Sequence, residues 1–181
     1  IIMITKTLFL TGTTKAISKY ISEQKESFHA VLRSGFHLQL LFISLCVILY
    51  FFFAGFLAEK LHDSSLIWPI RLSSLVVLSV GIYVVYNDGY LNGMRLFKEQ
   101  ALAEAIHSVV RFLLAIGLVY FGFNLYGVVF AYIIAPLFAL LFVWKTISLE
   151  KSREVFPIIT LLKFSLPITV YYGALMLAMD A

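Results

Sequence analysis

Charged residues are scarce in this chain of 181 residues, and cysteine is almost absent. Asp, Glu, Lys and Arg together make up 13% of the sequence, about half the share of a typical soluble domain. The single cysteine, Cys46, allows no internal disulfide. Hydrophobic residues reach 61%, and the mean hydropathy is +0.95. One compact core of this size could not bury that much apolar surface, so the composition predicts an integral membrane protein.

The motifs of common catalytic and ATP-driven proteins are missing as well. No Gly-x-x-x-x-Gly-Lys-Ser/Thr loop occurs, which excludes an ATP motor within the chain. There is no serine-nucleophile motif, no His-Glu-x-x-His helix and no cysteine pair for a metal. We therefore expect no enzymatic activity, no metal site, no cofactor and no nucleic-acid partner.

Long apolar runs predict an all-α, polytopic bundle of transmembrane helices. The expected spans lie at about residues 1–20, 36–58, 68–86, 101–122, 125–144 and 158–181. The turn-forming cluster Asn87-Asp88-Gly89 is expected to close the third of them.

The longest charge-free run predicts a hairpin. The 33 residues from Phe112 to Trp144 carry no formal charge, which is too long for one helix in an ordinary bilayer. The run must therefore fold back, and its one turn-like cluster lies between Gly122 and Gly127. The chain also starts at Ile1 rather than Met and stops at Ala181 directly after an apolar run. We expect a piece of a longer polytopic protein.

Positive charges are unevenly shared between the expected loops. Nine cations lie in alternate loops and two lie in the loops opposite. The nine are Lys15, Lys19, Lys25, Arg33, Arg95, Lys98, Lys145, Lys151 and Arg153, and the two are Lys60 and Arg71. Because basic loops stay on the cytoplasmic side, we expect a multi-pass protein of the cell membrane whose loops near Lys25, Lys98 and Lys151 are cytoplasmic.

A polar stripe follows one face of the helix that enters the hairpin. Glu104, His107, Ser108 and Arg111 are spaced i, i+3, i+4 and i+7. Arg111 lies about 10 residues, roughly 15 Å, from either end of its span, near the bilayer midplane. A charge there costs about 2.5–3.5 kcal/mol. The stripe has two interpretations. It lines a cavity in which Arg111 binds an anionic substrate and Glu104 and His107 act in coupling or gating. Alternatively, it lies at the cytoplasmic rim of the membrane, where Glu104 pairs with Arg111.

Three further charges are candidate site residues with two interpretations each. Lys6, in a threonine-rich stretch, is a cavity cation or a residue of the extracytoplasmic rim. Lys15 is a second cavity cation or a cytoplasmic anchor. Asp180, at the end of a charge-free run, is a site for a coupling ion, H⁺ or Na⁺, or a residue of the far interface.

Several motifs together resemble one transporter family. In chain order they are Leu10-x-Gly12 to Ala16-x-Ser18-Lys19-Tyr20-Ile21-Ser22-Glu23, Gly93-x-x-x-Phe97, Arg111-Phe112-Leu113-Leu114, Gly122-Phe123-x-x-x-Gly127-Val128-x-x-Ala131-Tyr132, and Leu162-Lys163-Phe164-Ser165-Leu166-Pro167 leading to Asp180. Their order and spacing resemble the first half of a Wzx-type polysaccharide flippase of the MOP superfamily. The resemblance implies helices two to seven of an inverted-V transporter, with residues 1–157 in the first half and 158–181 as the first helix of the second.

The resemblance also implies a function. Such a transporter moves a polyprenyl-pyrophosphate-linked oligosaccharide across the cytoplasmic membrane by alternating access, for cell-surface polysaccharide assembly. Its expected partners are the lipid-linked glycan, membrane lipids and other polysaccharide-assembly proteins. The alternatives are a multidrug or metabolite exporter of the same superfamily, in which an acidic cavity is expected, and a non-catalytic membrane subunit. A membrane-embedded transferase would need a catalytic acid or base, and the sequence offers none.

The nine-to-two distribution of cations generates a test of sidedness. Single cysteines introduced at Lys25 and Lys151 should react only with cytoplasmic thiol reagents, and one at Asn124 only with external reagents. Labelling of Asn124 and Lys151 from the same side would exclude the hairpin.

Overall fold

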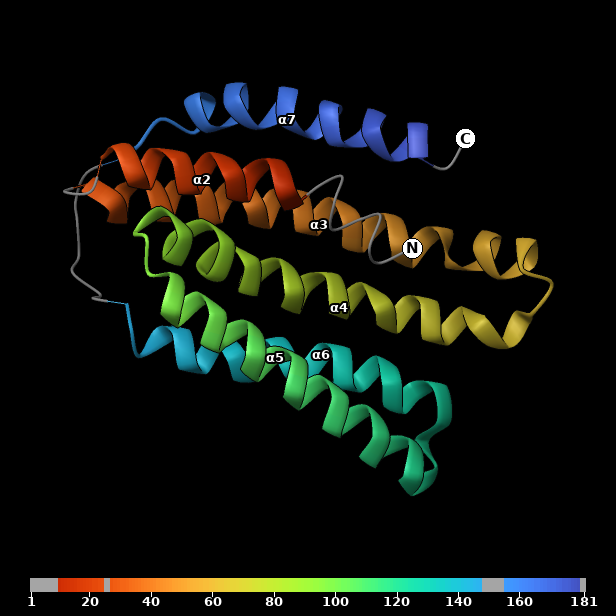
Figure 1. Ribbon diagram of the computed structural model, residues 1–181. Helices are drawn as coiled ribbons and strands as arrows, with labels where there is room; N and C mark the ends of the chain where they lie inside the picture. Colours follow the sequence, from red (N-terminus) through yellow and green to blue (C-terminus); the bar gives the residue numbers. More distant parts are fainter. Residues whose placement is uncertain (1–9, 25–26, 148–154, 180–181) are drawn as a thin grey trace.

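The chain forms a bundle of long helices (Figure 1). The computed structural model describes residues 10–24, 27–147 and 155–179, and every regular element within these ranges is helical. The elements are α2 (Thr11–Glu23), α3 (Phe28–Lys60), η3 (Ser64–Leu66), α4 (Ile67–Val84), η4 (Val85–Leu91), α5 (Phe97–Leu118), η5 (Val119–Phe123), α6 (Asn124–Trp144) and α7 (Ile158–Met179).

Four stretches of the described residues are long and apolar enough to cross a membrane. They are Phe28–Lys60, Ser64–Leu91, Phe97–Trp144 and Ile158–Leu175. The prediction of an all-α, multi-pass membrane bundle is therefore confirmed. The assignment of residues 158–181 to a second half of the fold remains a prediction.

The third of these stretches, 48 residues long, turns back on itself. Gly122 has a φ of +89° and Asn124 a φ of +46°, so the helical path breaks between them. Helices α5 and α6 then run antiparallel in contact (Figure 1). A Cβ at Gly127 would lie 3.0 Å from the backbone carbonyl carbon of Leu118, so glycine allows α6 to begin close to α5. The predicted hairpin is confirmed.

The predicted end of the third span at Asn87-Asp88-Gly89 is wrong. The chain continues through these residues as the π-helix η4 and turns only at Met94 and Arg95, where Arg95 has a φ of +61°. Asn87 and Gly89 are buried, and a turn there would leave backbone N–H and C=O groups without partners inside the bundle. The need to keep the backbone hydrogen-bonded therefore outweighs the preference of these three residues for a turn.

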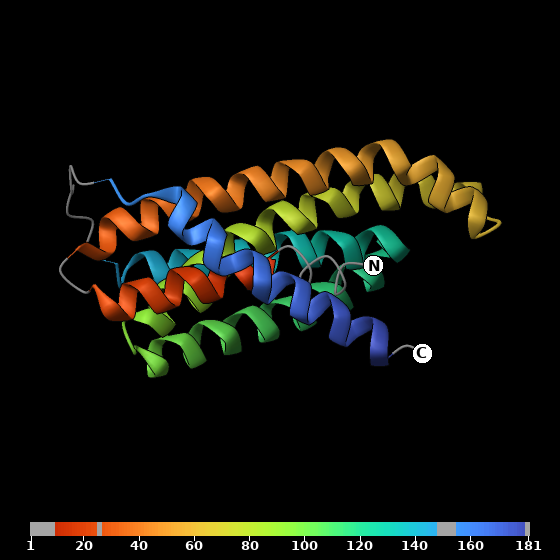
Figure 2. The ribbon, with the colours of Figure 1, turned by 90° about the horizontal axis from the view of Figure 1, so that it is seen from above.

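Helix α2 lies between α7 and the rest of the bundle (Figure 1). It contacts α3, η4 and α7, whereas α4 lies between α3 and α6 (Figure 1). Figure 2 shows α7 crossing over α2 at an angle. The close approach depends on Gly12, because a Cβ there would lie 2.7 Å from the backbone oxygen of Ser165 and would also meet the Thr169 hydroxyl.

The connections divide between the two ends of the bundle. The ends of α2, η4 and α6 and the starts of α3, α5 and α7 lie at one end, and the α3–α4 connection and the Gly122 turn lie at the other (Figure 1). The described helix ends that flank the alternate basic loops therefore share one end, as expected. At the opposite end, Asp63 accepts hydrogen bonds from the side chain and backbone of Ser65, which hold its pKa below the usual value. The cytoplasmic location of the basic end remains a prediction.

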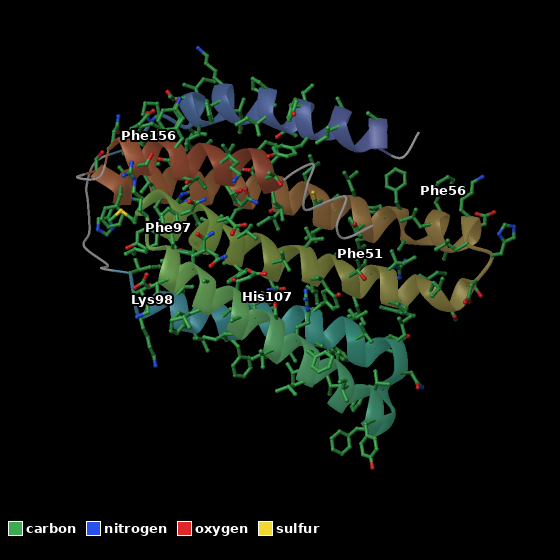
Figure 3. The ribbon with its side chains drawn as sticks, in the orientation of Figure 1. Phe51, Phe56, Phe97, Lys98, His107 and Phe156 are labelled. Atoms are coloured by element: carbon green, nitrogen blue, oxygen red, sulfur yellow. The ribbon has the colours of Figure 1, made fainter. Side chains whose placement is uncertain are left out.

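Large apolar side chains cover the outer faces of the bundle. Phe51, Phe52, Phe53 and Phe56 of α3 are all exposed, and Phe51 and Phe56 are labelled in Figure 3. An exposed aromatic surface of this kind would be unstable in water. In a membrane-spanning helix such a face suits contact with lipid or with another membrane helix.

The contact of α2 with α7 generates a stability prediction. Gly12→Ala should destabilise the full-length protein by about 1–3 kcal/mol, because the new methyl group meets backbone that cannot yield like a flexible side chain. Gly55→Ala is the matched control, since nothing lies within 4 Å of its Cβ position. The measurement is the thermal unfolding midpoint in detergent. Equal midpoints for the two variants would contradict the proposed packing.

Candidate functional site

A polar cavity of about 240 Å³ lies between α2, the α4–η4 helix and the start of α5. It is lined by Leu10, Thr11, Thr14, Lys15, Val84, Asp88, Asn92 and Gln100. The lining thus combines one cation, one carboxyl group, two amides and two hydroxyl groups. This set offers both hydrogen-bond donors and acceptors to a polar ligand.

The wall formed by η4 is irregular, which changes the usual spacing of its side chains. Seven residues, Val85–Leu91, form a π-helix, and such insertions occur frequently at functional sites. Asp88 is half-buried and accepts a hydrogen bond of 3.0 Å from the side-chain nitrogen of Asn87. Within the described residues, the buried side-chain oxygen of Asn87 has no hydrogen-bond partner.

The wall formed by α2 supplies hydroxyl groups and the cation. The Thr14 hydroxyl donates to the backbone oxygens of Leu10 and Thr11, each at 3.1 Å, so its lone pairs are left for a ligand. In the described parts of the chain, Lys19 forms an ion pair with Glu23, and His107 Nδ1 lies 3.7 Å from Glu104 Oε1. Lys15 and Asp88 therefore line the same cavity without forming an ion pair there.

A second, apolar cleft of about 510 Å³ lies on the α7 side of α2. Its lining consists of Lys15, Phe164, Pro167, Ile168, Tyr171 and Tyr172. Near it, the Lys19 ammonium lies 4.2 Å from the centroid of the Phe164 ring, a cation–π contact. Lys15 is exposed and lines both the polar cavity and the apolar cleft, so the two adjoin at this residue.

Two residues of the predicted polar stripe meet α4. The Tyr83 hydroxyl donates a hydrogen bond of 3.0 Å to Glu104 Oε2, and His107 Nδ1 lies 3.7 Å from Glu104 Oε1. The ring centroids of Tyr83 and His107 are 5.1 Å apart. His107, labelled on α5 in Figure 3, is buried, and within the described residues neither of its ring nitrogens has a hydrogen-bond partner.

Arg111 lies apart from the polar cavity. Its guanidinium carbon is 5.1 Å from the ring centroid of Tyr132 on α6, and the side chain is half-buried. Eleven residues separate it from Gln100 along α5, which corresponds to about 16 Å. The structure therefore does not bring Arg111 and Lys15 to one cavity. The other two candidates, Lys6 and Asp180, lie outside the described residues.

Sequence reasoning missed Asp88, Asn92 and Gln100 as candidate site residues. The signal for Asp88 was present, because an ionisable residue inside an apolar run indicates a functional site in a membrane protein. Its neighbours Asn87 and Gly89 instead favoured a turn. Gln100 carried no signal, because it lines the same cavity as Thr11 and Thr14 only through the packing of η4 against both α5 and α2.

The family model for polysaccharide biosynthesis proteins matches residues 1–179. The chain belongs to this family. It is the family of Wzx-type polysaccharide flippases of the MOP superfamily, so the resemblance inferred from the motifs is confirmed. No curated protein and no solved structure matches the chain.

Membership of the polysaccharide biosynthesis family changes how the two cavities are interpreted. The family and the membrane-length helices together make this a multi-pass membrane protein with a flippase role in polysaccharide assembly. A flippase must shelter a polar group inside the apolar bilayer while its lipid anchor stays in contact with lipid. A polar cavity that adjoins an apolar cleft provides both environments side by side.

Proposed function

We propose that this chain belongs to a transporter that flips a polyprenyl-pyrophosphate-linked oligosaccharide from the cytoplasmic to the outer leaflet by alternating access. One observation carries the proposal: Lys15 lines both the polar cavity and the apolar cleft. In a lipid-linked glycan, the pyrophosphate is likewise the junction between a polar glycan and an apolar chain. We infer that the positive charge of Lys15 binds that junction.

The charge of Lys15 supports a phosphate ligand. Hydrogen bonds between an ammonium group and phosphate are about twice as strong as neutral ones, and low dielectric strengthens them further. On the polar side, the hydroxyl and amide groups offer partners to sugar hydroxyls. On the apolar side, Pro167, Ile168 and the rings of α7 offer contacts to an isoprenoid chain.

The position of the cavity along the bundle fits loading from the cytoplasm. Lys15 lies eight residues before the end of α2, which places it about 12 Å from the basic end of the bundle. The cations of the alternate loops favour a cytoplasmic location for that end. A glycan lipid in the inner leaflet would therefore meet the polar cavity before the transporter changes conformation.

Arg111, Glu104 and His107 retain proposed roles outside this cavity. Arg111, half-buried against Tyr132, is a second cation for the phosphates during passage. Glu104 and His107 are candidates for coupling to H⁺, because a carboxylate and a buried imidazole lie 3.7 Å apart. Na⁺ is the alternative coupling ion.

The alternative of a drug or metabolite exporter is less well supported. Such an exporter is expected to have an acidic cavity for cationic compounds, whereas here Lys15 lines the polar cavity with Asp88. A cationic drug would meet a like charge at Lys15, which disfavours binding.

Replacing Lys15 tests the proposal directly. In the full-length protein, Lys15→Ala should lower export of a labelled lipid-linked glycan into liposomes by about tenfold or more, because a charge-assisted hydrogen bond to phosphate is lost. Lys98→Ala is the matched control: Lys98 is exposed at the same end of the bundle and lines neither cavity (Figure 3). Equal export by the two variants, at equal membrane abundance, would refute the role of Lys15.

Variants of Arg111 separate substrate binding from helix packing. Arg111→Ala should abolish export at normal membrane abundance. Arg111→Lys should keep part of the export, because lysine retains the positive charge but lacks the planar guanidinium group that binds two phosphate oxygens at once. Tyr132→Ala is the packing control, since it removes the ring beneath the guanidinium and leaves the charge. If Tyr132→Ala reproduces the loss seen with Arg111→Ala, or if Arg111→Ala exports normally, Arg111 does not bind substrate.

A further inference from the structure

Asp88 is the residue of the polar cavity that phosphate binding does not explain. A carboxylate repels phosphate, yet Asp88 lines the same cavity as Lys15 and forms no ion pair with it among the described residues. The two charges come from different walls, Lys15 from α2 and Asp88 from η4. A ligand in the cavity therefore meets a cation on one wall and a carboxylate on the other.

The other polar groups beside Asp88 are amides. Asn92 follows η4 directly, and Gln100 lies in the first turn of α5. Carboxylate oxygens accept hydrogen bonds from hydroxyl groups, and side-chain amides both donate and accept. These three side chains can therefore hydrogen-bond to the hydroxyl and acylamino groups of a sugar ring. They offer no cation to a second negatively charged group.

We propose that this cavity binds the sugar bonded to the diphosphate, and that Asp88, Asn92 and Gln100 determine which sugar is accepted. The inference rests on the proposed function, since it assigns the diphosphate to Lys15. A neutral sugar, with or without an acylamino group, can hydrogen-bond to Asp88. A uronic acid would place its own carboxylate against that of Asp88 and is rejected, because like charges brought together disfavour binding.

The local backbone supports a specific role for this wall. The π-helix η4 contains Asp88, and the side-chain nitrogen of Asn87 donates to Asp88 Oδ1 at 3.0 Å. That hydrogen bond holds the carboxyl group in place while its remaining lone pairs stay available. Asn87 is 2% exposed, so the group that orients Asp88 is itself fixed by the core.

The test measures binding of three probes to the full-length protein in nanodiscs at neutral pH. The probes are farnesyl diphosphate, farnesyl diphosphate bonded to glucose, and farnesyl diphosphate bonded to glucuronic acid. The wild-type protein should bind the glucose probe at least about tenfold more tightly than the glucuronic acid probe. Asp88→Asn, which keeps the shape of the side chain and removes its charge, should bring the ratio of the two affinities close to one.

Two further variants keep the inference falsifiable if Asp88→Asn folds poorly. Asn92→Asp adds a carboxylate to the same wall and should increase the preference for the glucose probe over the glucuronic acid probe. Gln100→Ala should weaken binding of the glucose probe about threefold to tenfold and leave farnesyl diphosphate binding unchanged. Gln24→Ala, an exposed amide that does not line the cavity, is the control and should change neither affinity.

The outcomes separate this inference from the proposed function. The sugar-selecting role is overturned if neither Asp88→Asn nor Asn92→Asp changes the preference for the glucose probe over the glucuronic acid probe. If farnesyl diphosphate binding still depends on Lys15 in that case, the proposed function stands. Failure of all three probes to bind the wild-type protein overturns both. A wild-type protein that binds the glucuronic acid probe as tightly as the glucose probe overturns the inference alone.

Discussion

The absence of water from the hydrocarbon core of a bilayer is the constraint on which this structure depends. Every backbone N–H and C=O inside the membrane must find a partner within the protein, which restricts the spanning segments to helices. The same constraint explains why the chain remains helical through Asn87 and Gly89, where sequence propensity favours a turn. It also confines the one break in the long apolar stretch to the Gly122 turn, at the end of the bundle.

Polar side chains are concentrated on the inward side of the bundle rather than on the face of α3. Lys15 and Asp88 line one cavity with the amide of Gln100, and Glu104 accepts a hydrogen bond from Tyr83. The outer face of α3, by contrast, presents a row of phenylalanines. The division between lipid-facing and cavity-facing surfaces explains how a chain so rich in apolar residues can hold a polar ligand. Among the described residues, Lys15 is the one that lines both cavities.

Much of the fold follows from the sequence, and less of the site does. Charge-free runs predict the spans and the Gly122 hairpin, because membrane length and turn chemistry both act locally. The sequence predicts the span from about residue 36, whereas α3 begins at Phe28, because a helix can extend beyond the apolar run that crosses the hydrocarbon. The polar cavity could not be predicted, because Thr14 and Gln100 lie 86 residues apart and meet only through tertiary packing. Lys15 was selected from its charge alone, whereas its place between two cavities required the packing of α7 on α2.

The central claim, that the apolar cleft beside Lys15 receives the isoprenoid chain of the substrate, can be tested by photo-crosslinking. The probe is a sugar-bearing prenyl diphosphate with a photoreactive group on the isoprene unit next to the diphosphate, bound to the full-length protein and mapped by mass spectrometry. The account predicts adducts concentrated between Phe164 and Tyr172 of α7, reduced by an excess of unlabelled lipid-linked glycan. Adducts confined to the lipid-facing stretch from Phe51 to Phe56, with none on α7, would contradict it.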